Sequence, residues 1–405
     1  MKLYFLAIPV LIALHLSFLS DVSAQSKDIL ETLLKNETGV IKKVIAEPEK
    51  YRLQILYTQI DRNKKNKPRF TSYRFGIDSS NYFYPASSVK LAAAVLAMHK
   101  LNSLNIPGLD KYTPLRIDSA FAGQTRVLTD TTSEDNLPSI AQYIKKILLV
   151  SDNDAYNRLY EFLGQSYLNT ELHKRGYRSV NLMHRLSSFL TREQNAHTNP
   201  FTFYHDSKVI YSQPAQYNPV PYQNENIKGL LQGTGYISGD SLVNMPKDFT
   251  YSNRFAIEDL QSLIKTIFFP ESVIRKNRFN LKKDDYSFLY KYMSMLPRES
   301  VHPYYDTSEY YDSYVKFFIY GDSKERIPGN IRIYNKVGDA YGYMIDNAYV
   351  VDQEKGVEFL LTAVIYVNED GIFNDDKYEY DTIGTPFMAE LGRMIYGYEL
   401  SRKKM

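Results

Sequence analysis

The chain has 405 residues, of which 44% are hydrophobic and 23% charged, and its formal net charge is +3. This composition is typical of an ordinary globular protein, large enough for one sizeable catalytic unit or two average domains. It gives no support to a nucleic-acid binder, because the one dense basic run, Arg62 to Arg69, lies between two strand-like segments and is typical of a solvated turn. We therefore expect no nucleic-acid partner.

The first 24 residues have the pattern of an export signal. Lys2 precedes an apolar stretch, and Val22-Ser23-Ala24 supplies small residues for cleavage. We interpret residues 1–24 as a signal peptide and residues 25–405 as one exported domain, periplasmic or secreted. The alternative is an uncleaved membrane anchor, and no other segment is apolar enough to span a bilayer.

The chain contains no cysteine and only seven scattered histidines. A disulfide framework, a thiolate nucleophile and a cysteine metal site are therefore excluded, and a zinc site is not expected. We expect no cofactor and no metal, and we expect a monomer.

The first predicted elements are a short helix over residues 26–34, a β-hairpin formed by strands 51–60 and 70–77, and a helix over 86–101. The pattern of residues 102–315 predicts a mainly helical region, since apolar residues keep helical spacing in 140–148, 155–162 and 257–264. A segment rich in tyrosine and proline, 199–252, breaks this pattern and predicts an inserted hairpin with loops.

The last part of the chain predicts a three-stranded meander and a helix. The strands are 331–336, 343–352 and 357–367, and the middle turn is 353–356. The helix has Thr385 as its expected N-cap and Pro386 as its first residue, and it presents Phe387, Leu391, Ile395 and Tyr398 on one face. The fold class is therefore α+β, with one antiparallel sheet built from both chain ends and flanked by helices.

The first candidate catalytic residues lie in the predicted helix 86–101. Ser87 and Lys90 are three residues apart, so on a helix they share a face. A serine needs a base to become a nucleophile, and a lysine serves when burial lowers its pKa. The apolar run from Leu91 to Met98 predicts that burial, and backbone N–H groups at the helix start suit a developing oxyanion.

Ser-x-x-Lys alone is a weak signal, because the chain contains it three times, at Ser87/Lys90, Ser262/Lys265 and Ser313/Lys316. Two further motifs distinguish the first instance. Ser151-Asp152-Asn153 lies between two helical segments, and Lys336-Val337-Gly338 ends a strand. Each has an alternative interpretation, the first as a polar helix cap and the second as a solvated strand end.

Ser-x-x-Lys, Ser-Asp-Asn and a Lys-x-Gly motif together mark class A β-lactamases and penicillin-binding proteins. On these residues, in this order, the chain resembles the serine β-lactamase and penicillin-binding protein superfamily over about residues 50–400. The resemblance implies that Ser87 is acylated, that Lys90 activates it, and that Ser151 relays a proton to the leaving nitrogen with help from Lys336. It also implies that Asn153 contacts the substrate, and that N–H groups of Ser87 and Asp339 bind the oxyanion beside Gly338.

Two departures from the family pattern concern the substrate and deacylation. Val337 stands where the family has a hydroxyl residue that helps to bind the substrate carboxylate, and Asp339 would repel an anionic substrate unless it is paired. The segment 183–200, where class A enzymes carry the carboxylate that activates water, has Glu193 as its only acid. Glu193 is therefore the candidate deacylation base, or else a surface charge.

Three functions follow from the sequence. The favoured one is an exported serine hydrolase of β-lactamase type, which hydrolyses a β-lactam or peptide-like amide. The alternatives are a D-Ala-D-Ala-type cell-wall peptidase or transpeptidase on the same fold, and a non-catalytic protein that binds the cell wall through the tyrosine-rich insertion. The expected partner is accordingly a small-molecule β-lactam or a peptidoglycan-like peptide.

Overall fold

The computed structural model describes residues 21–404. The predicted signal peptide therefore lies for the most part outside the described residues. A five-stranded sheet is the centre of the molecule, with the strand order β10-β11-β12-β1-β2 and antiparallel pairing throughout. The strands are β1 (Gln54–Arg62), β2 (Pro68–Phe75), β10 (Ile331–Ala340), β11 (Tyr343–Asp352) and β12 (Val357–Tyr366).

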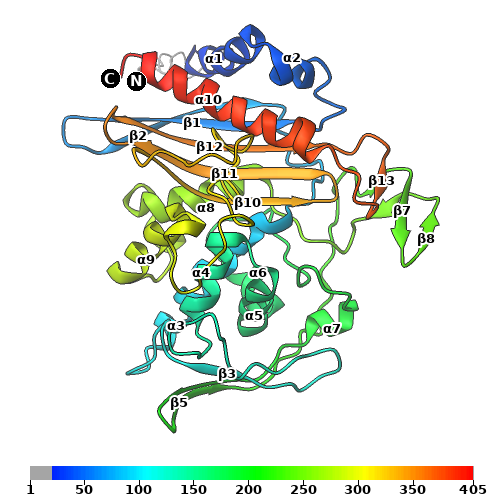
Figure 1. Ribbon diagram of the computed structural model, residues 1–405, viewed down its shortest axis with the longest axis vertical. Coiled ribbons are helices and arrows are strands. Elements are labelled where there is room, and N and C mark those ends of the chain that lie inside the picture. The colour runs from blue at the N-terminus through cyan, green and yellow to red at the C-terminus, as the bar shows by residue number, and fades with distance from the viewer. Residues whose placement is uncertain (1–20, 405) are drawn as a thin grey trace, which may run out of the picture.

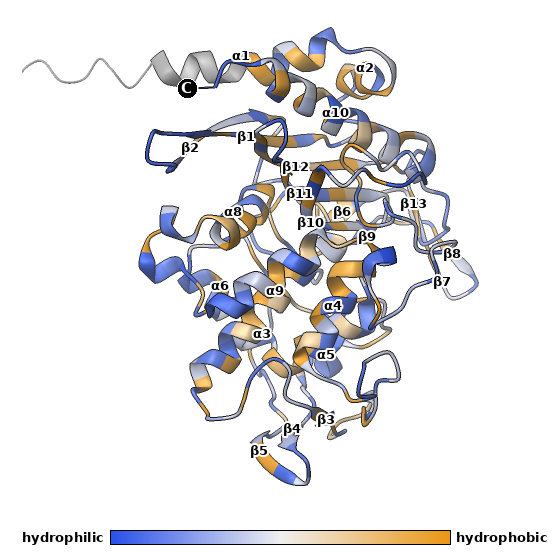
Figure 2. Cartoon of the chain, turned by 60° about the vertical axis from the view of Figure 1, so that its left-hand side comes forward, coloured by the Kyte–Doolittle hydropathy of each residue, from blue (hydrophilic) through white to orange (hydrophobic). Residues whose placement is uncertain are grey.

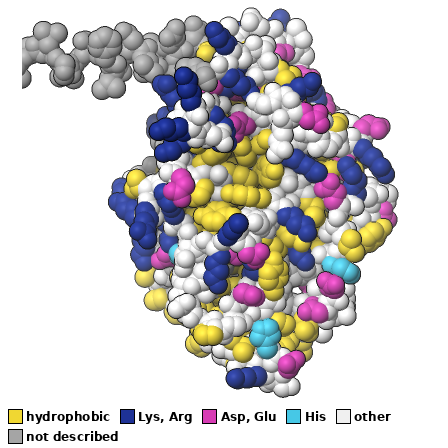
Figure 3. All heavy atoms as spheres, turned by 90° about the vertical axis from the view of Figure 1, so that its left-hand side faces the viewer, with side chains coloured by type: hydrophobic (Ala, Val, Ile, Leu, Met, Phe, Trp, Pro, Cys, Tyr) yellow, Lys and Arg dark blue, Asp and Glu magenta, His cyan; other side chains and the backbone are white. Residues whose placement is uncertain are grey.

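This sheet confirms the α+β fold class and the prediction that both chain ends build it. β1 pairs with β12, with Leu56 opposite Thr362, so the first strand joins the C-terminal meander. The basic run is exposed around the turn between β1 and β2, as predicted, and hydrophilic residues dominate that hairpin tip (Figure 2). On the face shown in Figure 3, lysine and arginine side chains are interspersed with acidic ones.

One face of the sheet is covered by helices from the two ends of the chain (Figure 1). These are α1 (Asp21–Asn36), α2 (Gly39–Ala46) and α10 (Thr385–Ser401). Phe387, Leu391 and Ile395 of α10 are fully buried in the core cluster on this side, as the sequence predicts. α2 was not predicted.

The start of α10 differs from the prediction. Gly384, and not Thr385, precedes the helix, because a π-helical turn over Tyr380–Gly384 runs directly into it. Thr385 is therefore already helical, and its hydroxyl donates back to the carbonyl of Tyr380 at 3.3 Å. A residue whose backbone continues a helical turn has no free helix end to cap.

The other face of the sheet packs against α8 (Ile257–Phe268) and, beyond it, the helical region (Figure 1). α3 (Lys90–Leu104) runs through the middle of this region, and every residue from Lys90 to Leu101 is buried. The neighbouring helices are α4 (Ile140–Val150), α5 (Asn153–Leu163), α6 (Gln165–Lys174), α7 (Arg192–Ala196) and α9 (Lys283–Ser294).

The tyrosine-rich segment 199–252 forms two hairpins with loops, where one was predicted. β4 (Phe201–His205) pairs with β5 (Lys208–Gln213) in the first hairpin, and its other edge pairs with β3 (Leu115–Ile117). β7 (Gly235–Ser238) and β8 (Ser241–Val243) form the second hairpin, and β7 also pairs in parallel with β13 (Ile372–Phe373). Two short strands complete the segment, β6 (Leu231–Gln232) and β9 (Lys247–Asp248).

Candidate active site

Ser87 lies in a 3-10 turn, η1 (Ala86–Val89), directly before α3. Ala86 has a φ of 47°, in the left-handed region that a residue with a Cβ rarely adopts. The flanking Ala86, Ser88 and Val89 are buried, whereas Ser87 stays partly exposed and lines an open pocket of about 350 Å³. The turn thus directs one hydroxyl residue at a pocket while its neighbours enter the core.

Strand β10 passes very close to this turn because residue 338 is a glycine. A Cβ at Gly338 would lie 2.6 Å from the backbone nitrogen of Ser87 and 2.7 Å from that of Ser88. Real Cβ atoms do not approach backbone nitrogens so closely, so only glycine lets the strand and the turn meet. This contact fixes Ser87 against the edge of the sheet.

Lys90 is a fully buried lysine at the first turn of α3. Its Nζ donates hydrogen bonds to the backbone oxygen of Ser151, to Oγ of Ser151 at 3.3 Å and to Oδ1 of Asn153 at 2.7 Å. Burial lowers the pKa of Lys90 to about 7, although attraction to Asp152 and Asp339 opposes the shift. Near neutral pH a large fraction of Lys90 is therefore an unprotonated amine, which is the form that can accept a proton.

Ser151 links the two lysines of the motifs. It closes α4 in a left-handed conformation, with φ 60°, and its Oγ accepts from Nζ of Lys90 and, at 2.8 Å, from Nζ of Lys336. Lys336 is buried and also donates to the carbonyl of Val337 at 2.7 Å. Burial, and secondarily the charge of Lys90, hold the pKa of Lys336 well below its ordinary value. Because Ser151 accepts both bonds, its own hydroxyl proton stays available to a third group.

Asp152 and Asn153 have different roles: the first caps a helix and the second lines the pocket. Asp152 caps α5, since its side chain accepts from the N–H of Ala155 at 2.8 Å, so the capping interpretation holds for this residue. The side chain of Asn153 lines the Ser87 pocket instead, where its Oδ1 faces Lys90 and its Nδ2 donates to Oγ of Ser187 at 2.8 Å. Ser187 carries no sequence signal and was missed.

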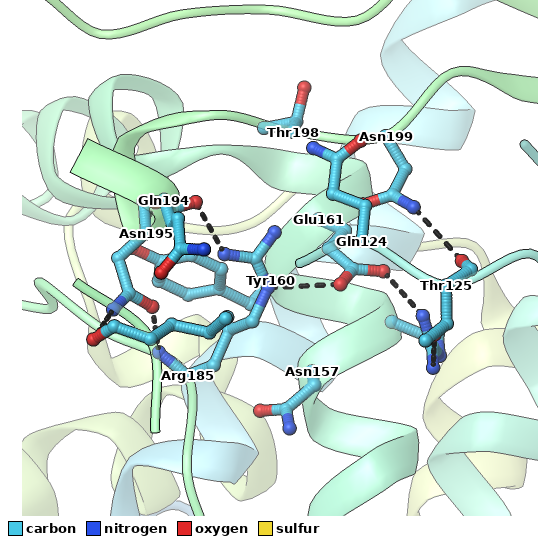
Figure 4. A network of polar contacts seen from close by, with 12 residues as sticks. Gln124, Thr125, Asn157, Tyr160, Glu161, Arg185, Gln194, Asn195, Thr198 and Asn199 are labelled. Atoms are coloured by element: carbon cyan, nitrogen blue, oxygen red, sulfur yellow. Dashed lines mark hydrogen bonds and ion pairs between the residues drawn. The ribbon is translucent and has the colours of Figure 1, made fainter. Parts of the chain in front are cut away.

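A buried polar network holds the segment that brings Ser187 to the pocket (Figure 4). Glu161 of α5 pairs with Arg185 at 2.9 Å and with Arg158 at 3.0 Å. Arg185 in turn donates to the carbonyls of Gln194 and His197. These bonds hold the start and the end of the segment 185–197 together. Buried charges of this kind need full pairing, and this network provides most of it.

The third Ser-x-x-Lys, Ser313/Lys316, has a structural role. Lys316 is buried, and its Nζ donates to Asn335 Oδ1 at 2.6 Å and to the carbonyl of Met293 at 2.7 Å. Asn335 donates on to the carboxylate of Asp346 at 2.8 Å. This network braces β10 at the residue before Lys336.

Three predicted site residues, Asp339, Val337 and Glu193, lie in different parts of the structure. Asp339 lines the Ser87 pocket with its side chain exposed at the mouth. Val337 is buried in the core cluster shared with α10, outside the pocket lining. Glu193 is exposed on α7 and lines a separate hollow of about 660 Å³ with Arg192 and Tyr217.

The pocket wall also contains residues that sequence reasoning did not single out. They are Tyr84, Tyr341, Tyr378, Tyr380 and Asp376. The high tyrosine content of the chain, 36 residues, was the only signal for the four tyrosines, and Asp376 had none. Among residues 21–404 there is no group of three or more His, Cys, Asp or Glu that could hold a metal ion, and no helix in that part of the chain is long and apolar enough to cross a membrane.

Comparison with known proteins gives one match to a family and several to solved structures. Residues 39–214 match the model of the β-lactamase enzyme family. No curated protein matches the chain. The solved structures include a β-lactamase from Burkholderia ambifaria that is 13% identical in sequence. The match covers 89% of this chain and 99% of the Burkholderia chain, with a TM-score of 0.48. Another is a mutant of PBP-A in an acyl-enzyme complex with penicillin G, which is 14% identical in sequence. That match covers 91% of this chain and 96% of the PBP-A chain, with a TM-score of 0.47.

Proposed function

We propose that this chain, whose residues 39–214 match the model of the β-lactamase enzyme family, is an exported serine hydrolase that forms an acyl-serine intermediate on Ser87. Its substrate is a β-lactam or a peptide-like amide, and its place of action is the periplasm or the medium. One observation carries the proposal most directly. The hydroxyl of Ser151 receives hydrogen bonds from both Lys90 and Lys336, and it does so beside the pocket that Ser87 lines.

Acylation begins with attack by Oγ of Ser87 on the amide carbonyl carbon. Lys90 accepts the hydroxyl proton, which its lowered pKa allows near neutral pH. The N–H groups of Ser87 and Asp339 are the proposed donors to the oxyanion. When the C–N bond breaks, Ser151 gives its proton to the leaving nitrogen and is reprotonated from the lysines that donate to it.

A second candidate is supported by the position of Glu193. The carboxylates that line the Ser87 pocket belong to Asp339 and Asp376, whereas Glu193 lines the separate hollow. If neither of these two carboxylates activates water in place of Glu193, the acyl-enzyme persists, as expected of a cell-wall peptidase of the D-Ala-D-Ala type. An intact set of Ser87, Lys90, Ser151 and Lys336 argues against a non-catalytic wall-binding protein.

The test combines covalent labelling with turnover. The mature protein is incubated with a fluorescent penicillin and with a chromogenic cephalosporin, and adducts are followed by intact mass. The proposal expects a label that Ser87→Ala abolishes and Ser262→Ala leaves unchanged, because Ser262 is an exposed residue of α8. Rapid turnover would support the β-lactamase, and a stable label would support the peptidase. Labelling that persists in Ser87→Ala would refute both.

A further inference from the structure

The pocket in front of Ser87 has acidic and aromatic walls. Its lining includes the carboxylates of Asp339 and Asp376, and no lysine or arginine is among the described residues that line it. Lys90 and Lys336 are buried behind Ser151, and their hydrogen bonds go to Ser151, Asn153 and Val337. A ligand in the pocket therefore meets the two carboxylates directly and the two amines only at the reacting centre.

Neither carboxylate is neutralised by an ion pair. Within residues 29–404, no lysine or arginine lies within 4 Å of the carboxylate of Asp339 or Asp376, although both side chains are exposed. Desolvation by the surrounding protein raises the pKa of Asp339, against the attraction of Lys336 and Lys90, which lowers it. An uncompensated carboxylate beside a ligand repels an anion and attracts a cation.

Four tyrosine rings complete these walls in two pairs. Tyr84 and Tyr341 lie edge to face with ring centroids 4.9 Å apart, and Tyr378 and Tyr380 lie 5.3 Å apart. The hydroxyls of Tyr378 and Tyr380 accept from the N–H groups of Asn374 and Gly342, which fixes both rings. Tyrosine faces attract ammonium groups. The ammonium of Lys247 already lies 5.0 Å from the ring centre of Tyr341, outside the pocket lining.

The tyrosine-rich insertion holds this wall in place. Its strand β7 pairs with β13, and Asn374, directly after β13, donates to the carbonyl of Ile237 in β7 at 3.2 Å. The loop from Asn374 to Tyr380 thus carries Asp376 and Tyr378 to the pocket with the insertion as its support.

We propose that the substrate of Ser87 carries a cationic group, such as an ammonium, on the side of the reacting amide where ordinary penicillins carry a carboxylate, and that Asp339 and Asp376 bind this group. The inference rests on the proposed function, since it assumes that Ser87 is acylated. It names a class of substrate: amides or lactams with a positive charge next to the leaving nitrogen.

The experiment uses three probes with one β-lactam nucleus. The first keeps its ring carboxylate, the second is the neutral primary amide, and the third is the aminoethyl amide, which carries an ammonium. The second-order rate of Ser87 acylation is measured for each by intact mass. We expect the rate to rise from the anion to the neutral amide to the cation, with about tenfold or more between the extremes, because one charge contact near a protein surface has about this size.

Variants assign the preference to its cause. Asp339→Asn and Asp376→Asn should each reduce the ratio between cation and anion several-fold, and the double variant should remove it. Asp240→Asn is the matched control, because it deletes an exposed carboxylate at the β7–β8 turn, away from the pocket lining. The control should keep the ratio of the parent protein.

The outcomes separate the inference from the function on which it rests. If all three probes acylate Ser87 and the anion reacts as fast as the cation or faster, the inference is wrong and the proposed function stands. If the cation reacts faster but the two asparagine variants keep the full ratio, the assignment to these carboxylates is wrong. If no probe acylates Ser87 even at millimolar concentration, the proposed function fails, and the inference falls with it.

Discussion

Lys90 and Asn153 orient each other at the base of the pocket. Because Nζ of Lys90 donates to Oδ1 of Asn153 at 2.7 Å, the amide of Asn153 must turn its NH₂ group the other way, where it donates to Ser187. One buried lysine is thus the proposed base and also fixes the amide orientation of Asn153 in the wall of the Ser87 pocket. A substitution of either residue should therefore disturb both proton transfer and substrate alignment.

The first prediction concerns pH. Since burial lowers the pKa of Lys90 to about 7, the amine is protonated below that pH and cannot accept the proton of Ser87. The acylation rate should fall about tenfold per pH unit well below pH 7 and level off above it. Measurement by intact mass from pH 5.5 to 9 tests this, and Lys90→Arg should lose acylation at every pH. A flat profile in the parent protein would contradict the role of Lys90 as the base.

The second prediction concerns Gly338. In Gly338→Ala the new methyl group would lie 2.6 Å from the nitrogen of Ser87, so the turn or the strand must move. We expect acylation to fall at least tenfold and the free energy of unfolding to fall by about 1–3 kcal/mol, as for other overpacked sites. Denaturant unfolding and the labelling rate measure the two effects.

Gly397→Ala is the control for this substitution. Gly397 is an exposed helical residue of α10, and a Cβ there would meet nothing within 4 Å. Alanine should raise the free energy of unfolding by about 0.5–1 kcal/mol through its higher helix propensity and leave labelling unchanged. Equal labelling by the two variants would show that the close approach of β10 does not matter for the site.

The sheet was predictable because its signals are local. Alternation and turn residues in 331–367 indicate the meander, and the apolar face of the last helix indicates where it packs. The start of that helix was not predictable, since Thr385 and Pro386 imitate a helix end, whereas the π-helical turn before them depends on tertiary packing. The second hairpin of the insertion was missed for a similar reason: β7 is completed by β13, more than 130 residues later.

The candidate site was predictable only where motifs mark it. Ser87, Lys90, Ser151, Asn153 and Lys336 stand in recognisable motifs. Hydrogen bonds join the last four of these residues, and Ser87 lines one pocket with Asn153. Ser187, Asp376 and the wall tyrosines have no motif, because their place depends on how two loops fold over the pocket. The wall that we propose to select the substrate therefore had to come from the structure.

The third prediction tests the network that positions Ser187. Glu161→Gln would leave Arg158 and Arg185 without their shared buried carboxylate. Breaking such a pairing should cost about 3–5 kcal/mol of unfolding free energy, and acylation should slow because Leu186 and Ser187 line the pocket. The control is Asp322→Asn, which breaks an ion pair with Arg393 at the surface and should cost at most about 1 kcal/mol. Similar costs for the two variants would mean that the buried pairing is not important for stability.

The fourth prediction concerns the fate of the acyl-enzyme. Glu193 is exposed on α7 and faces a hollow that Ser87 does not line, so Glu193→Gln should leave the rate of label release unchanged within about twofold. Ser187→Ala is the comparison, because its hydroxyl lies in the Ser87 pocket and accepts from Asn153; it should change that rate. Both rates are obtained by removing excess probe and following the adduct by intact mass. If Glu193→Gln slowed release tenfold, the carboxylate would have to reach the acyl-enzyme through movement of α7, and the protein would then be a β-lactamase with its own deacylation base.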